Sequence, residues 1–401
     1  MNKIQSIIDK SINGIEFNLL LHCLRVYLET ESPVQLSEYI ACQRGAIRWQ
    51  VFFDLCVMHR VSPVVTKTII ENNATDFPKE IMDKLNQQST KDQLQAMELA
   101  AETIRLVRLL ESNGIRVIVL KGAALAVPLY GDVGMRPTHD VDLLINKADV
   151  QAAYALVETY GYKSDHDLLS RKFTNKQLAA TLKASHHEKF QKERLVVELH
   201  WQLKPYLKQD VAFDKLFHDS QLLSLLNIKL HVINTNELFV YLALHGAMHG
   251  WCRIRWLLDI ALLAKHHPHP SGEITEFANQ AIILINSLLS FPTEKTLITQ
   301  PTLPQLKLTN KTVDYMVNYN EVRSPLFSLK HFKSEYYFYT VFFNRNSLHS
   351  FMNVFFLPRP CDFEIVSLPN RFFWLYYPLR PLFWISRAMK GWVKFKINRN
   401  N

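Results

Sequence analysis

The sequence predicts an α+β protein that is mainly helical, and three observations predict it. Apolar residues recur at helical spacing from the start of the chain to residue 112. The helix-breaking pair Asn113-Gly114 is followed by Ile115–Leu120, a short, branched apolar run typical of a buried strand. Helical spacing returns from Asn234 onward. We therefore expect an α/β core flanked by N-terminal and C-terminal helical lobes.

The composition fits such a body. The chain has 401 residues, of which 48% are hydrophobic, and its 11 glycines and 17 prolines do not recur at a fixed period. Five scattered cysteines form no Cys-x-x-Cys pair, which favours a reducing compartment and disfavours a cysteine-built zinc site. The sequence shows neither an uninterrupted signal-like apolar stretch at its start nor a window apolar enough to span a bilayer. We expect a cytoplasmic protein.

The elements of the first α/β unit follow from turn signals and apolar runs. In chain order we expect a long helix over Lys79–Glu111, a strand over Ile115–Leu120, a short helix ending at Tyr130, a strand near His139–Ile145 and a helix over Asp149–Gly161.

Residues 185–203 contain two runs that can pair as a β-hairpin, the second being Arg194–Gln202. Glu198 and His200 share one face of this second run. The opposite face is apolar and consists of Leu195, Val197, Leu199 and Trp201. After a start near Asn236-Glu237, one long helix is expected over Leu238–Lys265.

These patterns divide the sequence into four segments. They are an N-terminal helical lobe (1–112), an α/β core (113–232), a C-terminal helical region (233–370) and a basic aromatic tail (371–401). The tail holds seven cations and no acid, so it carries most of the net charge of +9.

Asp140 and Asp142 give the strongest indication of chemistry. Two residues apart on a strand, their carboxylates project from one face, while Val141 and Leu143 pack behind them. Such a pair can bind Mg²⁺ or Mn²⁺, with a nucleoside triphosphate and water supplying further oxygen ligands. Solvated acids at a strand end are the alternative, because Asp-x-Asp alone is a weak motif.

Lys121, Gly122 and Ala123 form a candidate phosphate-binding turn. A glycine between strand and helix lets backbone N–H groups approach a phosphate, and Lys121 adds positive charge. A tight turn closed by a helix cap is the alternative. Arg136 is placed either to contact a phosphate or to pair with Asp140.

Glu198 can supply a third carboxylate if its strand lies beside that of Asp140 and Asp142, and is otherwise an exposed strand acid. Metal ions held by three carboxylates stabilise in-line attack on an α-phosphate. Glu198 can also help to deprotonate the attacking hydroxyl.

Five separate pieces of this sequence, in order and spacing, resemble the uncharacterised bacterial nucleotidyltransferase family of the polymerase-β-like nucleotidyltransferase superfamily. They are Leu120–Ala124, Leu129–Asp132, Arg136-Pro137, Asp140–Leu144 and Val197–Trp201. The resemblance continues through Leu244–Gly246, His249, Trp251 and Arg253–Trp256 to Asp259–Ala261, and covers roughly residues 95–265.

The resemblance implies a small mixed sheet flanked by helices, with Asp140 and Asp142 as metal ligands, Glu198 as the third carboxylate and Gly122 in the phosphate-binding turn. It implies transfer of a nucleoside monophosphate from a triphosphate, which we take to be ATP, with release of pyrophosphate. The hydroxyl acceptor would be a protein, a sugar or a small molecule. The superfamily usually has Gly-Ser or Gly-Gly where this chain has Gly122-Ala123, so a side-chain hydroxyl for phosphate is missing.

His200, His245, His249 and Arg255 are further candidates for the cleft between the helical lobe and the sheet. His245 and His249 have a zinc-binding spacing, but Gly246 stands where a metalloprotease has glutamate, so we expect them to line the cleft or to pack in the core.

Arg255 lies four residues before Asp259 and is expected to pair with it, contact with nucleotide or acceptor being the alternative. His186, His187 and His200 lie near the predicted hairpin and are each expected to be structural more often than catalytic.

The tail, residues 371–401, combines nine aromatic residues with its seven cations. Three interpretations stay open, in decreasing order of preference: packing onto the body with the cations in water, peripheral contact with an anionic membrane, and binding of nucleic acid. For the whole chain, a nucleotide-binding module without turnover and a membrane-peripheral adaptor are the alternatives to a nucleotidyltransferase.

Overall fold

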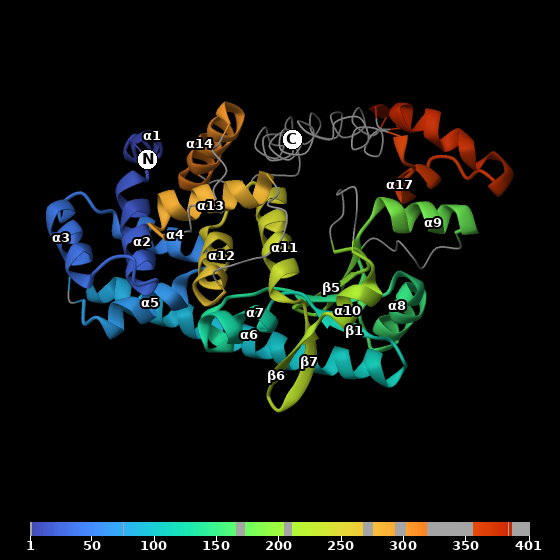
Figure 1. Ribbon diagram of the computed structural model, residues 1–401, viewed down its shortest axis with the longest axis horizontal. Coiled ribbons are helices and arrows are strands. Elements are labelled where there is room, and N and C mark those ends of the chain that lie inside the picture. Colours follow the sequence, from blue (N-terminus) through green and yellow to red (C-terminus); the bar gives the residue numbers. More distant parts are fainter. Residues whose placement is uncertain are drawn as a thin grey trace, which may run out of the picture. The chain divides into compact units, whose positions relative to one another are not determined.

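The computed structural model describes residues 2–74, 76–165, 173–203, 211–267, 276–292, 302–318, 356–383 and 385–386 (Figure 1). Helices dominate, and the seven strands form one mixed sheet in the order β3-β4-β5-β2-β1-β7-β6. This confirms the mainly helical α+β class. The chain packs into two compact units, of which the first comprises residues 1–105, 119–141 and 219–324, and the second comprises residues 106–118, 142–218 and 325–401.

The N-terminal part of the first unit is helical, as predicted. Its helices are α1 (Asn2–Asp9), α2 (Gly14–Tyr27), α3 (Pro33–Gln43), α4 (Trp49–Met58), α5 (Ser62–Glu71) and all but the end of α6 (Lys79–Ser112). Helix α2 packs against α3, α4 and α5 and buries Phe17, Leu20 and Leu24 completely. Burial of apolar surface on several sides of one helix makes α2 the centre of this lobe.

Later residues complete the same unit. They form α11 (Thr235–Met248), α12 (Ile254–His266), α13 (Glu276–Leu288) and α14 (Leu303–Val317). Helix α14 contacts α1, and the Asn13 side-chain amide donates a hydrogen bond of 3.3 Å to the Val317 carbonyl. Two parts of the sequence about 300 residues apart thus share one core.

The single long helix expected over Leu238–Lys265 is wrong, because a turn separates α11 from α12. Gly250 and Trp251 in this turn have φ values of 59° and 52°, which no α-helix contains. Trp251 is fully buried and folds back over Gly246, where an added Cβ would lie 2.1 Å from the indole ring. The close approach of this ring explains the glycine.

The strands of the first unit include a hairpin that the apolar pattern of the sequence does not predict. It consists of β6 (Gln221–Leu225) and β7 (Ile228–Val232), joined by Leu226 and Asn227 with φ values of 48° and 63°. Two successive left-handed residues are typical of a type I′ turn. Val232 pairs in parallel with Val119 at the end of β1 (Val117–Val119). The chain then continues through α7 (Ala123–Tyr130) and η1 (Val133–Met135).

The second unit contains the predicted hairpin. Its elements are β2 (Val141–Ile145, from Asp142), η2 (Lys147–Asp149), α8 (Val150–Thr159), β3 (Lys163–Ser164), α9 (Asn175–Ala184), β4 (His187–Lys192), β5 (Leu195–His200) and α10 (Phe213–His218). Strands β4 and β5 are antiparallel, with Phe190 opposite Val197 and His187 opposite His200. The predicted apolar face of the second strand is confirmed at Val197, Leu199 and Trp201, which are all buried.

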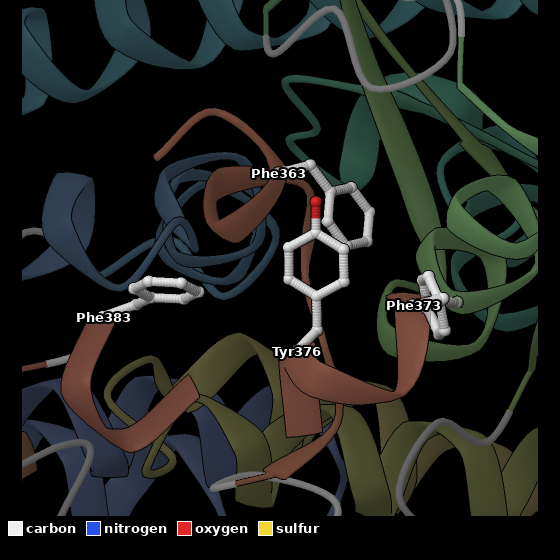
Figure 2. Close-up of a cluster of buried hydrophobic side chains, with 5 residues drawn as sticks. Phe363, Phe373, Tyr376 and Phe383 are labelled. Atoms are coloured by element: carbon white, nitrogen blue, oxygen red, sulfur yellow. The ribbon is translucent and has the colours of Figure 1, made fainter. Parts of the chain in front are cut away.

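The C-terminal part of the second unit packs around an aromatic cluster. It contains α17 (Pro360–Phe363), η4 (Asn370–Leu375) and a helical stretch over residues 376–383. Figure 2 shows the rings of Phe363, Phe373 and Phe383 around Tyr376, which is fully buried, and Ala180 of α9 completes the cluster. The described part of the predicted tail therefore has a packed structure, while residues 384 and 387–401 lie outside the described residues.

Among the residues that the structure describes, no helix has both the length and the hydropathy needed to cross a bilayer.

Candidate functional site

The second unit brings Asp142 of β2 together with Glu198 and His200 of β5, a neighbouring strand in the sheet. One ligand atom from each of the three lies within 4.8 Å of the others. His200 Nε2 is 3.2 Å from Asp142 Oδ1 and 3.4 Å from Glu198 Oε2. Because residues 198 and 200 project from the same face of a strand, this side of β5 can meet Asp142 with both side chains.

This site is buried on one side and open on the other. The Asp142 side chain is 0% exposed and that of His200 is 6% exposed, whereas that of Glu198 is 21% exposed. Burial opposes protonation of His200, but its hydrogen bonds to Asp142 and Glu198 outweigh this effect and raise its pKa. The His200 imidazole thus contacts both carboxylates, and Glu198 faces solvent, where a substrate can reach it.

The donor set fits a divalent cation. Two carboxylates with converging oxygens suit Mg²⁺ or Mn²⁺, and an imidazole nitrogen is a further ligand that Mn²⁺ accepts readily. His186, His187 and His200 form a second group whose ligand atoms also lie within 4.8 Å of one another. A metal ion at this site could therefore be coordinated by the carboxylates of the first group or by the imidazoles of the second group.

His186 and His187 are positioned by the end of α9. The Trp201 indole N–H is 2.9 Å from the carbonyls of both Leu182 and Ser185, and the Trp201 backbone N–H donates to the His186 carbonyl at 2.9 Å. These bonds fix the segment between α9 and β4 against the end of β5. The imidazoles next to His200 are thus held by a rigid support.

Asp140 precedes β2 and belongs to the first unit. The Thr138 hydroxyl donates to the Asp140 backbone carbonyl at 3.3 Å and lies 3.5 Å from the Asp140 carboxylate. These contacts shape the loop that leads into the strand. Convergence of Asp140 with Asp142 and Glu198 on one cation stays a prediction.

Gly122 caps the N-terminus of α7 with φ 65° and ψ −124°, a conformation that a side chain strains. An added Cβ would meet only ordinary contacts, at 3.8 Å from the Asp140 carbonyl and from Thr138 Oγ1. The backbone conformation, rather than a lack of space, therefore requires glycine here. Lys121 and Ala123 on either side are both buried.

Arg136 is buried and pairs with Asp259 rather than with Asp140. Its Nε and Nη2 donate to the two Asp259 oxygens at 2.9 and 2.8 Å, and the Tyr130 hydroxyl donates to Asp259 at 2.7 Å. The predicted pair between Arg255 and Asp259 is wrong, because Arg255 donates to the Pro137 carbonyl at 2.5 Å. Asp259 thus binds Arg136 through both oxygens instead of pairing with Arg255, its neighbour four residues earlier on the helix.

His245 and His249 pack in an aromatic group. Their ring centroids are 4.7 Å apart, and Trp256 lies 5.4 Å from His245 and 5.1 Å from His249. Burial, together with the charge of Lys121, lowers the pKa of His245 well below its ordinary value. His245 is half-buried and His249 is exposed, so the observations favour packing of both rings against Trp256 over a zinc site.

Sequence reasoning missed Arg60 and His59, which lie in the turn between α4 and α5. His59 Nδ1 accepts a hydrogen bond of 3.2 Å from the backbone N–H of Ile254, 195 residues later. No periodicity or spacing signals a contact of that range, so only the folded chain reveals it.

Comparison with known proteins gives one match. Searches of curated proteins and of solved structures find none. A family model described as "Uncharacterised nucleotidyltransferase" matches residues 45–282, more than half of the chain, and this range contains Asp140, Asp142 and Glu198. The chain belongs to this uncharacterised nucleotidyltransferase family.

Proposed function

We propose that this nucleotidyltransferase transfers a nucleoside monophosphate from a triphosphate, ATP by preference, to a hydroxyl on a protein, sugar or small molecule, with release of pyrophosphate. The observation that supports it best is the convergence of Asp142 and Glu198 with His200 between β2 and β5. Two acids from neighbouring strands, one buried and one reaching solvent, suit a reaction that starts from a charged triphosphate.

Asp142 and Glu198 would hold Mg²⁺ or Mn²⁺, with Asp140 as the expected third carboxylate. When bound, such a cation neutralises phosphate charge and lowers the pKa of a coordinated hydroxyl. His200 keeps the two carboxylates in place, since its Nε2 contacts both. Glu198 is the more exposed acid and is placed to accept the proton of the acceptor hydroxyl.

Labelled triphosphates test this proposal. With Mg²⁺ or Mn²⁺ and α-labelled triphosphate, we expect the chain to form labelled product and pyrophosphate, and Asp142→Asn to abolish both. Glu193→Gln is the matched control, because Glu193 is an exposed acid in the turn of the same hairpin. Undiminished labelling by Asp142→Asn would show that the acid site is assigned wrongly.

A second candidate is a nucleotide-binding module without turnover. Ala123 favours it, because the turn at Gly122 offers no hydroxyl and makes no side-chain cap. This candidate predicts Mg²⁺-dependent binding of a triphosphate and no release of pyrophosphate. Calorimetry that detects no binding would eliminate it.

Peripheral contact with an anionic membrane is a third candidate, favoured by exposed apolar side chains near the tail. Seven large ones are at least 38% exposed: Ile365, Val366, Phe372, Trp374, Tyr377, Leu382 and Ile385. Residues 387–401 add five cations by sequence. In flotation, we expect the full chain to rise with anionic vesicles more than with neutral ones, and Trp374→Ser to rise less with the anionic vesicles. Equal flotation of the two proteins would remove the candidate.

We place the protein in the cytoplasm as part of the same proposal. All five cysteines are free thiols, as a reducing compartment would keep them.

A further inference from the structure

Arginine side chains of the first unit gather around the start of α12. Arg253 is the residue before the helix and Arg255 is its second residue. Between them, the backbone N–H of Ile254 donates to His59 Nδ1 at 3.2 Å. Since Arg60 directly follows His59, this hydrogen bond brings a third arginine to the same helix terminus. Three cations from two distant parts of the sequence therefore meet.

The acids nearby do not balance these cations. Four guanidinium groups interact here, those of Arg60, Arg136, Arg253 and Arg255, and Asp259 is held by Arg136 through both oxygens. Asp140 and Asp92 are acids whose charges interact with that of Arg60. Among the described residues, these four arginines therefore interact with three acids, one of which is already held by Arg136.

The hydrogen-bonding capacity of this group is also incompletely used. The Nε atoms of Arg253 and Arg255 are buried and have no hydrogen-bond partner. Within the part of the chain that the structure describes, the Arg60 guanidinium makes no hydrogen bond or ion pair. Arg255 is 6% exposed, and its Nη1 donates a hydrogen bond to the Pro137 carbonyl. Buried arginine donors ordinarily find acceptors, so an acceptor from outside the chain fits here.

The electrostatic consequences follow from the geometry. Burial, together with Arg255 and Arg253, lowers the pKa of Arg60 to about 8. Burial and Arg136 lower the pKa of Arg255 to about 10. Helix α12 has 13 residues and no acid in its first turn, so its N-terminal N–H groups add to the positive potential. An anion bound here would relieve the repulsion among these guanidinium groups.

We propose that Arg60, Arg253 and Arg255, with the N-terminus of α12, bind a polyphosphate chain. A polyphosphate carries several negative charges and many acceptor oxygens, which match three guanidinium groups and a helix terminus. The assignment rests on the proposed function, in which the ligand belongs either to the nucleoside triphosphate or to a phosphorylated acceptor.

Inorganic tripolyphosphate in EDTA is the probe, because binding to arginines needs no metal. We expect it to bind the full chain in calorimetry and to raise Tm. Arg60→Gln should weaken binding by about tenfold or more, since one charge-assisted contact is lost. Its Tm without ligand should stay equal or rise, because a like charge has been removed. Arg60 has φ 57°, and glutamine bears the same backbone strain as arginine there.

Arg44→Gln is the matched control, an exposed arginine of the same unit that follows α3. Arg60→Gln and Arg253→Gln that bind tripolyphosphate as tightly as the parent and Arg44→Gln would overturn the proposal. A fall in the Tm of Arg60→Gln without ligand and no change in affinity would assign Arg60 a structural role instead and also overturn it.

Two further experiments are needed. The first tells whether the bound polyphosphate belongs to the nucleotide or to a phosphorylated acceptor, and the second tests the arginine site independently of the proposed transferase activity. Displacement of tripolyphosphate by a non-hydrolysable triphosphate assigns the site to the nucleotide, and simultaneous binding assigns it to a phosphorylated acceptor; either outcome supports an anion site. Asp142→Asn should bind tripolyphosphate normally in EDTA. Persistent labelling by Asp142→Asn would therefore defeat the proposed function and leave the arginine site standing.

Discussion

At the scale of single residues, Gly122 and Asp142 show two ways in which the fold constrains one position. A buried carboxylate such as Asp142 is costly in isolation, and His200 offsets that cost with a hydrogen bond of 3.2 Å. Gly122 meets a backbone requirement instead, because its φ is 65° while the space beside it is open to a methyl group.

The requirement at Gly122 predicts a specific loss of stability. Gly122→Ala should lower the free energy of unfolding by about 1–3 kcal/mol, since alanine must adopt a strained conformation. Urea unfolding measures this change. Gly45→Ala is the control, because an added Cβ there meets nothing within 4 Å. Equal losses in the two variants would contradict the explanation.

His59 predicts how stability depends on pH. Burial and the charge of Arg253 lower its pKa to about 3, compared with 6.5 in an unfolded chain. Between pH 6.5 and about 3, His59 is therefore protonated in the unfolded state and neutral in the folded state. As pH falls from 6.5 towards 3, this group should lower the free energy of unfolding by about 1.4 kcal/mol per pH unit.

Urea unfolding of the parent and of His59→Asn from pH 7 to about pH 5 checks this slope. Arg253 is the charged group that acts on His59, and the comparison with His59→Asn removes every contribution that does not come from His59 itself. The variant should lose stability less steeply with acid. Parallel pH profiles would show that His59 does not cause the acid sensitivity.

Single residues differ in how far the sequence reveals them. Asp142 and Glu198 could be predicted, because two-residue spacing on strands fixes the face to which each side chain points. Arg60 could not, since its place at the start of α12 depends on a hydrogen bond across 195 residues. The same limit explains Arg255, whose donor goes to a carbonyl 118 residues away instead of to Asp259.

At the scale of elements, α12 anchors the loop that follows α7. Asp259 in its middle accepts hydrogen bonds from Arg136 and Tyr130, and all three side chains are buried. One carboxylate of α12 thereby positions the segment that leads to Asp140. A buried ion pair of this kind fixes geometry more than it adds stability, but its disruption is costly.

Asp259→Ala should therefore lower the free energy of unfolding by about 3–5 kcal/mol, because Arg136 is left buried without its counter-charge. Chemical unfolding followed by circular dichroism measures the loss. Lys84→Ala is the control: Lys84 pairs with Glu80 at 2.7 Å on the surface of α6, and its removal should change little. Comparable effects of the two substitutions would contradict a structural role for Asp259.

Most elements could be predicted from their periodicity, and the exceptions have local causes. The alternation of β5 and the length of α6 are confirmed. The split between α11 and α12 depends on Trp251 packing over Gly246, and the β6–β7 hairpin depends on a left-handed turn at Leu226 and Asn227 without glycine. Neither feature gives a strong sequence signal.

At the scale of the whole molecule, each compact unit draws on distant parts of the sequence. In the first unit α1 contacts α14, and in the second unit α9 contacts α17. Helical spacing shows that a helix has an apolar face, but it does not show which partner covers that face. The division of the sequence into four consecutive segments therefore stays a prediction, since each compact unit combines residues from distant parts of the sequence.

Tyr376 tests the packing of the C-terminal part of the second unit. Its hydroxyl donates to the Val366 carbonyl at 2.6 Å and accepts from the Leu368 N–H at 2.8 Å. Tyr376→Phe should lower the free energy of unfolding by about 1–3 kcal/mol, because two hydrogen bonds are lost that each contribute about 0.5–1.5 kcal/mol. Tyr377→Phe is the control, since Tyr377 is 41% exposed. Equal stability of both variants would contradict the docked arrangement.

The central claim is that Asp142 and Glu198 bind one divalent cation together. Titration of the chain with Mn²⁺, followed by electron paramagnetic resonance of the free ion, measures this binding directly. We expect Asp142→Asn and Glu198→Gln each to weaken it by about tenfold or more, while Glu193→Gln binds as the parent does. Unchanged Mn²⁺ affinity in both Asp142→Asn and Glu198→Gln would contradict the account.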